Sequence, residues 1–426
     1  MRAALTSIAL LALGMASPAA AQAPLQTCLT FDAVLELASQ RDPSVEVALA
    51  GEAEADANIL DARSLYRPRV DAVGRTGIGS TGVVDSGVSN SLGFRASQRV
   101  LDFGDAKYAR LSARSEFAAA QNDTQQVRID AASQAGLSAL TYFEADAQLQ
   151  LTQRRQSYFE RQLAATDTLL ELGGATRTER AAVASQLADA KSFAEELAFR
   201  KERALTQIQI QTDTNQTLCA RATFPSALLR EDATAPQQAI ARAVESNANL
   251  AALDDRADAE AARAKREARA RLPIIDVVAT GAYSSTNAFD DFEFRDRIGV
   301  DVRVPLYSGN ALGARKRRAS ARERAARARS LDFRRQLTQD VSITWRRIRS
   351  LREQLESRRE VERQTLLQFE AAELELGAGT KSLRDLVEIR LEYEAAGLER
   401  IRTEADIARQ QLTLRALTGR LARSPN

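Results

Sequence analysis

The chain has 426 residues, its 59 Lys and Arg are nearly balanced by 57 Asp and Glu, and it contains no histidine. A balanced charge argues against bulk binding of nucleic acid, which needs a clear basic excess. The lack of histidine removes the commonest general base and metal ligand, which argues against most hydrolases and zinc sites. We therefore expect a protein that is not an enzyme and has no metal or cofactor.

The N-terminus has the pattern of a secretory signal peptide, residues 1–21. Arg2 supplies the positive charge, a short apolar run follows it, and Ala19-Ala20-Ala21 fits the small-residue cleavage rule. The run is too short to span about 30 Å of hydrocarbon, which argues against a membrane anchor. The mature chain is predicted to begin at Gln22 and to be exported.

Two cysteines occur in the chain, Cys28 and Cys219. An exported protein meets an oxidising compartment, in which two thiols can pair. Cys28 lacks the small residue that usually precedes a lipidated cysteine, because Leu25-Gln26-Thr27 stands before it. We favour a disulfide between the two cysteines, with two free thiols as the alternative.

The distribution of proline and glycine predicts two very long helices. No proline lies between Pro68 and Pro225 or between Pro305 and Pro425, and these tracts are rich in residues that favour helix. A tract of this length makes a helix on the order of 100 Å long, whose apolar stripe must pack against long neighbours. In the second tract the spacing of apolar residues is that of a coiled-coil seam, which consists of Leu337, Val341, Thr344, Ile348, Leu351 and Leu355.

Glycine clusters mark two regions that have the period of β-strands. Val300 and Val302 alternate with Asp301 and similar polar residues, which predicts a strand with one apolar and one polar face. The other three strands of the two hairpins show comparable alternation. The polar face is predicted to carry Asp71, Arg75, Asp276, Asp301 and Arg303, and an ordinary half-exposed sheet is the alternative to a water-filled lumen.

The two halves of the chain repeat one another. Pro68 and Pro273 differ by 273 − 68 = 205 residues, and the pairs Gly104 with Gly309 and Gly174 with Gly379 have the same separation. In the second strand of each hairpin, this offset aligns apolar positions of one repeat with polar positions of the other, as with Val300 and Arg95. A compensated one-residue slip in the loops or a β-bulge would explain the difference.

We divide the mature chain into a first repeat, 22–220, a linker, 221–236, and a second repeat, 237–426. The first repeat is expected to contain a hairpin at about 69–102, a long helix at 104–172, a tip turn at 173–178 and a return helix. The second is expected to contain a hairpin at about 274–305, a long helix at 309–376, a tip turn at 377–380 and a return helix.

Four strands in one chain cannot close a membrane barrel, and an open strand edge cannot lie in lipid. Three chains would supply 3 × 4 = 12 strands, an even number in the range of membrane barrels. Aromatic rings in or beside the hairpins fit the interfacial girdles of such barrels, with ordinary hairpin packing as the alternative. These residues are Tyr66, Phe94, Phe103, Tyr283, Phe289, Phe292, Phe294 and Tyr307.

The sequence resembles the TolC family of outer-membrane efflux and secretion channels. Residues 65–70 (Leu-Tyr-Arg-Pro-Arg-Val) and 271–275 (Arg-Leu-Pro-Ile-Ile) match the entry from helix into the first strand of each hairpin. Residues 98–104 and 304–309 are similar to the exit from the second strand, and 376–388 to the helix–turn–helix of the periplasmic tip. The doubled order of these motifs covers the chain from about Leu29 to the C-terminal helix.

The resemblance implies a mainly α protein with a small β part, in which long coiled-coil hairpins and four strands per chain assemble as a homotrimeric 12-stranded β-barrel on an α-helical tunnel. It implies an outer-membrane duct that passively exports substrates in efflux or in type I secretion. The implied partners are a periplasmic adaptor, an inner-membrane ABC or proton-driven transporter and outer-membrane lipid, but no nucleic acid.

The resemblance also implies an iris-like gate at the periplasmic end. The family's positions just past the second tip turn correspond to Lys381, Asp385 and Glu388, and rings of carboxylates there would attract cations. Under the offset of 205 residues, Asp385 corresponds to Arg180, beside Glu179, so an acidic position becomes basic in the first repeat. Arg180 is then expected to pair with a carboxylate of the neighbouring tip, and a solvated helix face is the alternative for all five charges.

Candidate docking points for the adaptor are the tip residues Gly174, Ala175, Thr176, Gly379 and Thr380, which also suit plain helix capping. The basic run at 315–318 is expected near lipid phosphates or on a solvated helix face. Two other classes of protein are a periplasmic coiled-coil adaptor and a coiled-coil structural protein without a channel. The duplication and the amphipathic hairpins argue against both.

Overall fold

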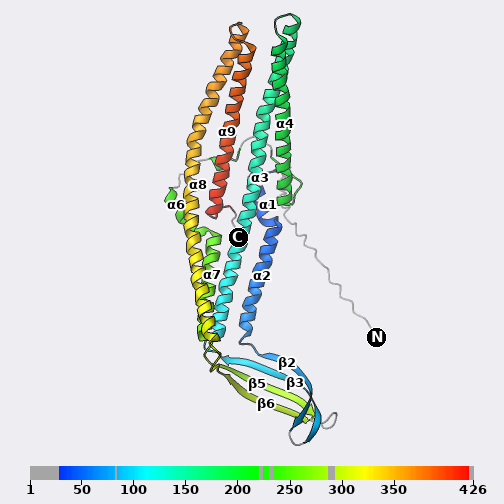
Figure 1. Ribbon diagram of the computed structural model, residues 1–426, viewed down its shortest axis with the longest axis vertical. Coiled ribbons are helices and arrows are strands. Elements are labelled where there is room, and N and C mark those ends of the chain that lie inside the picture. Colours follow the sequence, from blue (N-terminus) through cyan, green and yellow to red (C-terminus); the bar gives the residue numbers. More distant parts are fainter. Residues whose placement is uncertain (1–27, 82–83, 220–223, 230–234, 286–292, 422–426) are drawn as a thin grey trace, which may run out of the picture.

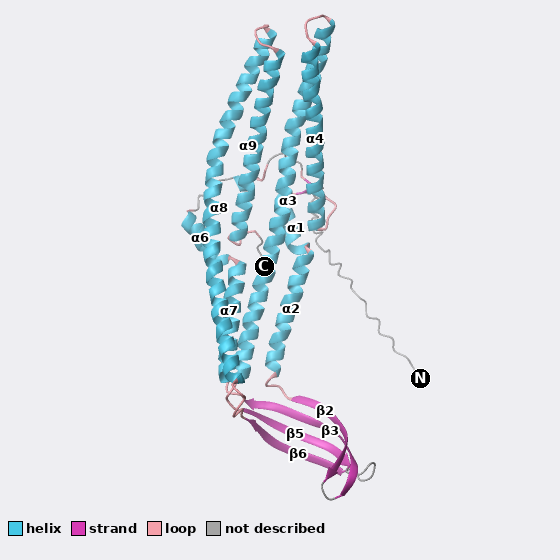
Figure 2. Ribbon diagram, in the orientation of Figure 1, coloured by secondary structure: helices cyan, strands magenta, loops and turns pink. Residues whose placement is uncertain are grey.

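Figure 1 shows the computed structural model of the protein, which describes residues 28–81, 84–219, 224–229, 235–285 and 293–421. The molecule is elongated, with helical hairpins at one end and a β-sheet at the other (Figure 2). The predicted signal peptide, part of the expected linker, and Phe289 and Phe292 lie outside the described residues.

The order of elements is nearly the same in the two halves of the chain. The first half contains β1 (Cys28–Leu29), α1 (Phe31–Arg41), α2 (Pro43–Ser64), β2 (Arg69–Thr81), β3 (Val84–Leu101), α3 (Asp105–Glu171), α4 (Arg177–Thr212) and β4 (Thr217–Leu218). The second half contains α5 (Ser226–Leu229), α6 (Pro236–Ser246), α7 (Ala248–Arg269), β5 (Ile274–Ser285), β6 (Glu293–Arg303), α8 (Ala311–Gly377) and α9 (Leu383–Leu417).

Helices α3 and α8 dominate the molecule. Each contains 67 residues, which corresponds to a length of about 100 Å. The seam predicted in α8 is confirmed, because all six of its residues are buried: Leu337, Val341, Thr344, Ile348, Leu351 and Leu355. Among the helices that the structure describes, none combines the length and the apolar character needed to cross a membrane.

Next to the sheet the helices form a single layer, in which α2 contacts α3, α3 contacts α7 and α7 contacts α8 (Figure 1). Farther from the sheet, α3 pairs with α4, α8 pairs with α9, and α3 also contacts α9. The largest core cluster draws most of its residues from α1, α3, α4 and α9, with a few from β1, β4 and the segment around α5, and it is rich in alanine. The helices approach closely here, since a Cβ on Gly136 would lie 2.8 Å from the Leu35 side chain and 2.9 Å from that of Leu412.

The four long strands form one antiparallel sheet in the order β2-β3-β5-β6. Strand β3 pairs with β5 and joins the two hairpins, so β2 and β6 are the edges of the sheet. The apolar face is exposed in the single chain, as shown by Ile298 at 80% and Val70 at 68%. On this face the rings of Phe94 and Phe294 border Gly281, where a Cβ would lie only 2.8 Å and 3.1 Å from them.

The second hairpin is one residue longer than the first. Arg69 pairs with Ser97 in the first hairpin, whereas Ile274 pairs with Arg303 in the second. The two separations are 97 − 69 = 28 and 303 − 274 = 29 residues. The offset between the repeats therefore changes from 205 to 206 within the hairpins, which explains the difference in apolar phase, because Val300 now corresponds to Phe94.

Of the two explanations left open, a slip and a bulge, the structure shows a slip, but it is not compensated after the hairpins. The long helix α3 begins at residue 105 and α8 at residue 311, a difference of 206. Left-handed residues precede both helices, namely Phe103 and Gly104 in the first repeat and Gly309 and Asn310 in the second. Gly104 therefore corresponds to Asn310 and not to Gly309. The separation of 205 arose because glycine and asparagine both tolerate a positive φ, so either of two adjacent positions can carry the glycine.

The short strands β1 and β4 pair in parallel beside the core, and a disulfide joins Cys28 to Cys219 with a Cα–Cα distance of 4.8 Å. This is the pairing that we favoured over free thiols. The bond spans a sequence separation of 191 residues. It ties the N-terminal segment to the chain that follows α4.

Replacing Cys28 by Ser should lower the free energy of unfolding by about 2–5 kcal/mol, because the unfolded chain regains the freedom of a long loop. Thermal unfolding of the purified protein, with and without reductant, measures this change. Cys219→Ser should cause the same loss, and reductant should have no further effect on either variant. Equal stability of wild type and both variants would contradict a structural role for the bond.

Candidate functional site

The two helical hairpins end in turns of the same backbone geometry. Gly173 and Gly379 both have a φ of 73°, which glycine adopts without steric strain. A Cβ on either glycine would meet no atom within 4 Å, so both turns are open in the single chain. The second turn extends beyond the expected end at residue 380, because Ser382 is the N-cap of α9.

Two of the predicted gate residues take part in capping the return helices. The backbone amide of Glu179 donates to the Thr176 hydroxyl at 3.2 Å, and the Thr176 amide donates to the Glu179 carboxylate at 2.8 Å. The hydrogen bonds from the Thr176 backbone and hydroxyl lower the pKa of Glu179. Likewise, the Asp385 amide donates to the Ser382 hydroxyl at 3.2 Å, and that hydroxyl donates to the Asp385 carboxylate at 2.8 Å.

The expected equivalence of Asp385 with Arg180 is wrong. The two N-caps are 382 − 176 = 206 residues apart, so Asp385 corresponds to Glu179. Both repeats therefore place a carboxylate in the first helical turn, where it stabilises the free amides of the helix start. Arg180 does not reach another tip in this chain but forms an ion pair with Asp167 of α3 in its own hairpin.

The other predicted gate residues also have partners close by. The Lys381 ammonium lies 3.0 Å from Glu375 and the Glu388 carboxylate lies 3.3 Å from Arg384. Asp385 and Glu388 are exposed, whereas the intervening Leu386 is buried. The second tip thus presents these carboxylates on the face that is not packed against the rest of the chain. The expected docking residues Gly174, Thr176, Gly379 and Thr380 are exposed, and Ala175 is partly exposed.

The polar residues predicted for the two hairpins lie together on one face of the sheet. Asp276 stands directly opposite Asp301 in the register. Arg99 lies 3.7 Å from Asp276, and Arg95 lies 3.6 Å from Asp301, so each carboxylate of this like-charged pair has a guanidinium partner. The strand alternation places the rest of the predicted set on the same face, namely Asp71, Arg75 and Arg303.

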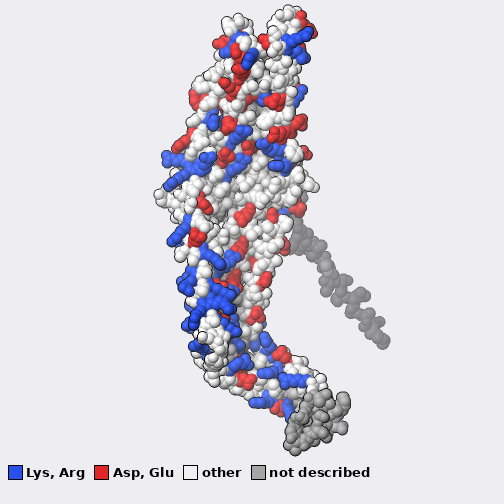
Figure 3. Space-filling view, viewed as in Figure 1, with Lys and Arg blue, Asp and Glu red and all other residues white. Residues whose placement is uncertain are grey.

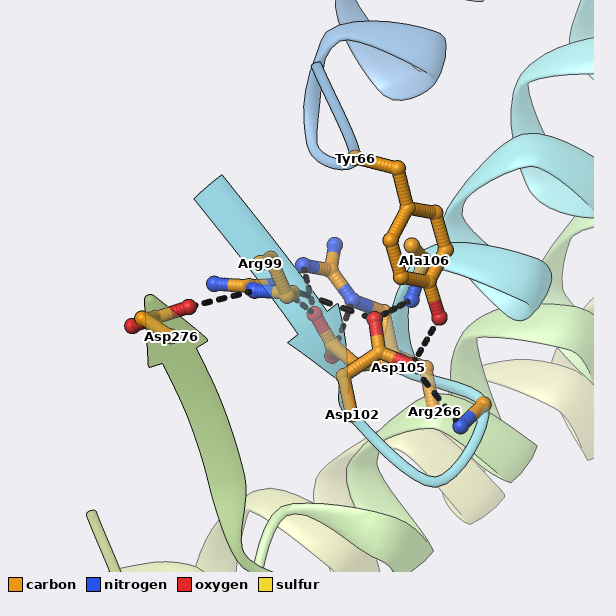
Figure 4. Close-up of polar contacts among 8 residues, drawn as sticks. Tyr66, Arg99, Asp102, Asp105, Ala106, Arg266 and Asp276 are labelled. Carbon is orange, nitrogen blue, oxygen red and sulfur yellow. Dashed lines mark hydrogen bonds and ion pairs between the residues drawn. The ribbon is translucent and has the colours of Figure 1, made fainter. Parts of the chain in front are cut away.

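A polar elbow connects the sheet to the helices (Figure 4). Buried Asp102 follows β3 and accepts hydrogen bonds from the Ala106 amide at 2.8 Å, the Gly104 amide at 3.0 Å and the Tyr66 hydroxyl. Burial alone would raise the pKa of Asp102, but these hydrogen bonds and Arg99 outweigh burial and lower it. Tyr66, which we grouped with the interfacial aromatic residues, is a hydrogen-bond donor in this elbow.

The elbow also joins the two repeats to each other. Asp105, at the start of α3, accepts from Arg99 of β3 at 3.2 Å and from Arg266 of α7 at 2.8 Å. Arg99 also reaches Asp276 of β5 (Figure 4). This cluster was not predicted from the sequence, although Asp102 and Asp105 bracket the strand-to-helix transition, where helix-capping residues are expected.

A buried ion cluster, which no sequence pattern indicated, lies between the two helical hairpins. Glu394 of α9 is 4% exposed and accepts from Arg390 at 2.8 Å. Arg155 of α3 lies 3.3 Å from Glu394 and donates to Asp189 of α4 at 2.8 Å. The pair Arg390 and Glu394 has the four-residue spacing of many exposed helix pairs, so only the tertiary structure distinguishes it.

Aromatic rings surround the Arg390 guanidinium. It lies 4.8 Å from the ring centroids of Tyr158 and Phe369 and 5.3 Å from that of Tyr393. These rings come from α3, α8 and α9, so the cluster contacts both hairpins. Cation–π attraction in a desolvated setting contributes up to about 2 kcal/mol.

Burial raises the pKa of Glu394 to about 7, because the loss of hydration outweighs attraction to Arg390 and Arg155. The side-chain atoms Arg155 Nε and Glu394 Oε2 are buried without a hydrogen-bond partner, although they face one another. The carboxylate is therefore incompletely stabilised in its ionised form.

A sequence profile of the outer membrane efflux protein family matches residues 34–216 and 239–420, which is most of the chain and includes both hairpins. The chain belongs to the outer membrane efflux protein family. Its sequence is similar to that of the outer membrane efflux protein BepC of Brucella suis biovar 1 (strain 1330). The two are 22% identical over 403 residues, which cover 94% of this chain and 87% of BepC.

The fold of this family member is similar to that of the CmeC outer membrane channel of Campylobacter jejuni, with a TM-score of 0.80 and 16% identity over 93% of this chain and 87% of that one. It is also similar to a membrane protein from Pseudomonas aeruginosa, with a TM-score of 0.81 and 16% identity over 92% of each chain. The protein is thus an outer-membrane efflux channel protein with a periplasmic helical extension. The coiled-coil alternatives without a channel are not favoured.

The pH dependence of stability should report the state of Glu394. A carboxyl whose pKa is raised in the folded state takes up a proton on folding. Its contribution to the free energy of unfolding is therefore greatest below its ordinary pKa of 4.5 and is lost as the pH rises through about 7. The loss is on the order of 3 kcal/mol.

Glu394→Gln should remove this component, so its thermal unfolding temperature should change less between pH 5 and pH 8 than that of wild type. Glu392→Gln, an exposed neighbour on the same helix, is the matched control and should retain the wild-type dependence. Identical pH profiles for Glu394→Gln and wild type would rule out this role.

Proposed function

We propose that three copies of this chain close into one exit duct, a 12-stranded β-barrel continued by an α-helical tunnel. The supporting observation is that the sheet and the helix layer are open on the same two sides. Strand β2 follows α2, and α8 follows β6, so one side carries α2 and β2 and the other carries β6 and α8.

A head-to-tail contact between unlike sides closes into a ring if the rotation between copies allows it. Pairing β6 of one copy with β2 of the next satisfies the backbone groups of both edges, as lipid requires. Three copies supply 3 × 4 = 12 strands. The exposed apolar face, which includes Val300 at 63% and Leu92 at 67%, then faces the hydrocarbon.

A heat-modifiable band tests this assembly. Outer membranes that contain the full-length protein should give a trimer band on a denaturing gel without boiling and a monomer band after boiling. The purified trimer should also form ion-conducting channels in planar bilayers. A mature chain that is monodisperse, monomeric and water-soluble without detergent would contradict the proposal.

We further propose that the duct conducts its substrates passively and performs no covalent chemistry. A periplasmic adaptor would join it to an inner-membrane ABC or proton-driven transporter, which supplies the energy. The adaptor would dock between the tips, at Gly174, Ala175, Thr176, Gly379 and Thr380. The exposed carboxylates of the second tip, Asp385 and Glu388, would form rings at the entrance, with Lys381, Glu179 and Arg180 beside them.

Ion selectivity tests the proposed lumen. Asp301→Lys reverses one charge on the polar face of each copy, beside Arg95, and should shift single-channel selectivity towards anions. Lys316→Glu, a charge reversal on the helix outside the sheet, is the control and should change selectivity less. Selectivity unaffected by Asp301→Lys would contradict exposure of this face to the lumen.

Substitution of Gly379 tests docking at the tip. In Gly379→Asp the new side chain points into open space, so trimer yield should stay normal while export falls, because the added charge and bulk oppose the adaptor. Gly173→Asp carries the same strain of a positive φ at the first tip and controls for a folding defect. Loss of the trimer in both variants would assign these glycines to folding alone.

A further inference from the structure

The open side of α8 carries arginines among alanines. Ala319 and Ser330, on the side that packs towards α7, are buried. With 3.6 residues per turn, the opposite side of the helix is fixed by these positions. It presents Ala314, Arg317, Ala321, Arg324, Ala325, Ala328 and Arg335, all of which are exposed. Figure 3 shows Lys and Arg gathered over this part of α8, next to the sheet.

The open side of α2 carries carboxylates among alanines. Ala55 and Ile59 are buried on the side that packs against α3. The opposite side of α2 presents Glu46, Ala50, Ala53, Glu54, Ala57 and Asp61, and all six residues are exposed. The two outer edges of one layer therefore have small, closely packable surfaces whose charges are opposite in sign.

The charges on these two edges have no ion-pair partner in the described part of the chain, in contrast to those on the flanks of α8. Arg327 on one flank pairs with Glu323 at 2.8 Å, and Arg334 lies 3.5 Å from Asp254 of α7. The arginines and carboxylates of the outer edges make no such contact. Both sets are thus available to groups outside this chain.

The spacing of the two sets matches. Arg317 and Arg324 are seven residues apart, as are Glu54 and Asp61, and seven residues of helix rise about 10.5 Å. Helix α2 ends at the sheet and α8 begins there, so the two helices run in opposite directions. Asp61 lies about 4.5 Å from the sheet end of α2, and Arg317 about 9 Å from the start of α8, a difference that an arginine side chain spans.

We propose that α8 of one copy packs against α2 of the next, with Arg317 paired to Asp61 and Arg324 paired to Glu54 between alanine surfaces. In this register Arg335 lies about one turn beyond Glu46, and its positive charge adds to the attraction between the two edges. The inference rests on the proposed trimer and names the contacts that order its copies. Because like sides repel and unlike sides attract, the charges favour head-to-tail closure.

Charge reversal tests the contact in the full-length protein. Arg317→Glu combined with Arg324→Glu should reduce the trimer band by roughly tenfold, because like charges then face each other. Adding Asp61→Arg and Glu54→Arg to the same chain should restore the trimer. Arg318→Glu combined with Arg329→Glu makes the same change of charge on another side of α8 and should leave the trimer intact.

Cross-linking identifies the neighbours directly. Arg324→Cys combined with Glu54→Cys should give covalent dimers and trimers on oxidation, whereas Arg318→Cys combined with Glu54→Cys should give none.

Three outcomes would overturn the inference. If the variant Arg317→Glu with Arg324→Glu assembles normally but retains less anionic phospholipid, the arginines bind lipid and the inference is overturned. If wild type forms trimers while the cross-link is absent, the inference fails alone. If wild type forms no trimer, the proposed function fails as well.

Discussion

In the proposed assembly the sheet lies in hydrocarbon, where an unpaired strand edge costs several kcal/mol for each bare amide or carbonyl, and the proposed closure of the barrel depends on that constraint. The sheet has two such edges, β2 and β6, and an apolar face that is exposed in the single chain. The helices that continue from these strands, α2 and α8, stand at the edges of their own layer. The edges of the sheet and of the helix layer therefore lie on the same two sides of the chain.

Charged groups stabilise the fold at three places along the molecule, and their carboxylates differ in how fully they are hydrogen-bonded. At the elbow, Asp102 and Asp105 accept hydrogen bonds from β3, from α3 and α7, and from the turn after α2, which fixes the sheet to the helix layer. At the tips, Glu179 and Asp385 are stabilised by local capping. Between the hairpins, the Glu394 carboxylate is buried, and its ion pairs do not fully offset the loss of hydration. Of the three places, the contact between the hairpins is thus the one whose charged groups are least completely hydrogen-bonded.

The sequence-based predictions were wrong where two adjacent positions can exchange residue types at little energetic cost. A left-handed turn accepts glycine or asparagine, so glycines at 104 and 309 suggested an offset that the backbone does not keep. The same error paired Asp385 with Arg180 in place of Glu179. The polar-face residues were easier to place, because strand alternation assigns each side chain to a face regardless of the loop length.

Local patterns along the chain were enough to predict the two long helices, from the distribution of proline and glycine, and the seam of α8, the amphipathic strands and the duplication, from periodic spacing. The resemblance to a channel family followed from the order of these local patterns. Only the tertiary structure decided that β3 pairs with β5, that Arg155, Arg390 and Glu394 share one buried site, and which sides of α2 and α8 are left open. These features join residues far apart in sequence, and local spacing carries no information about which distant surfaces meet.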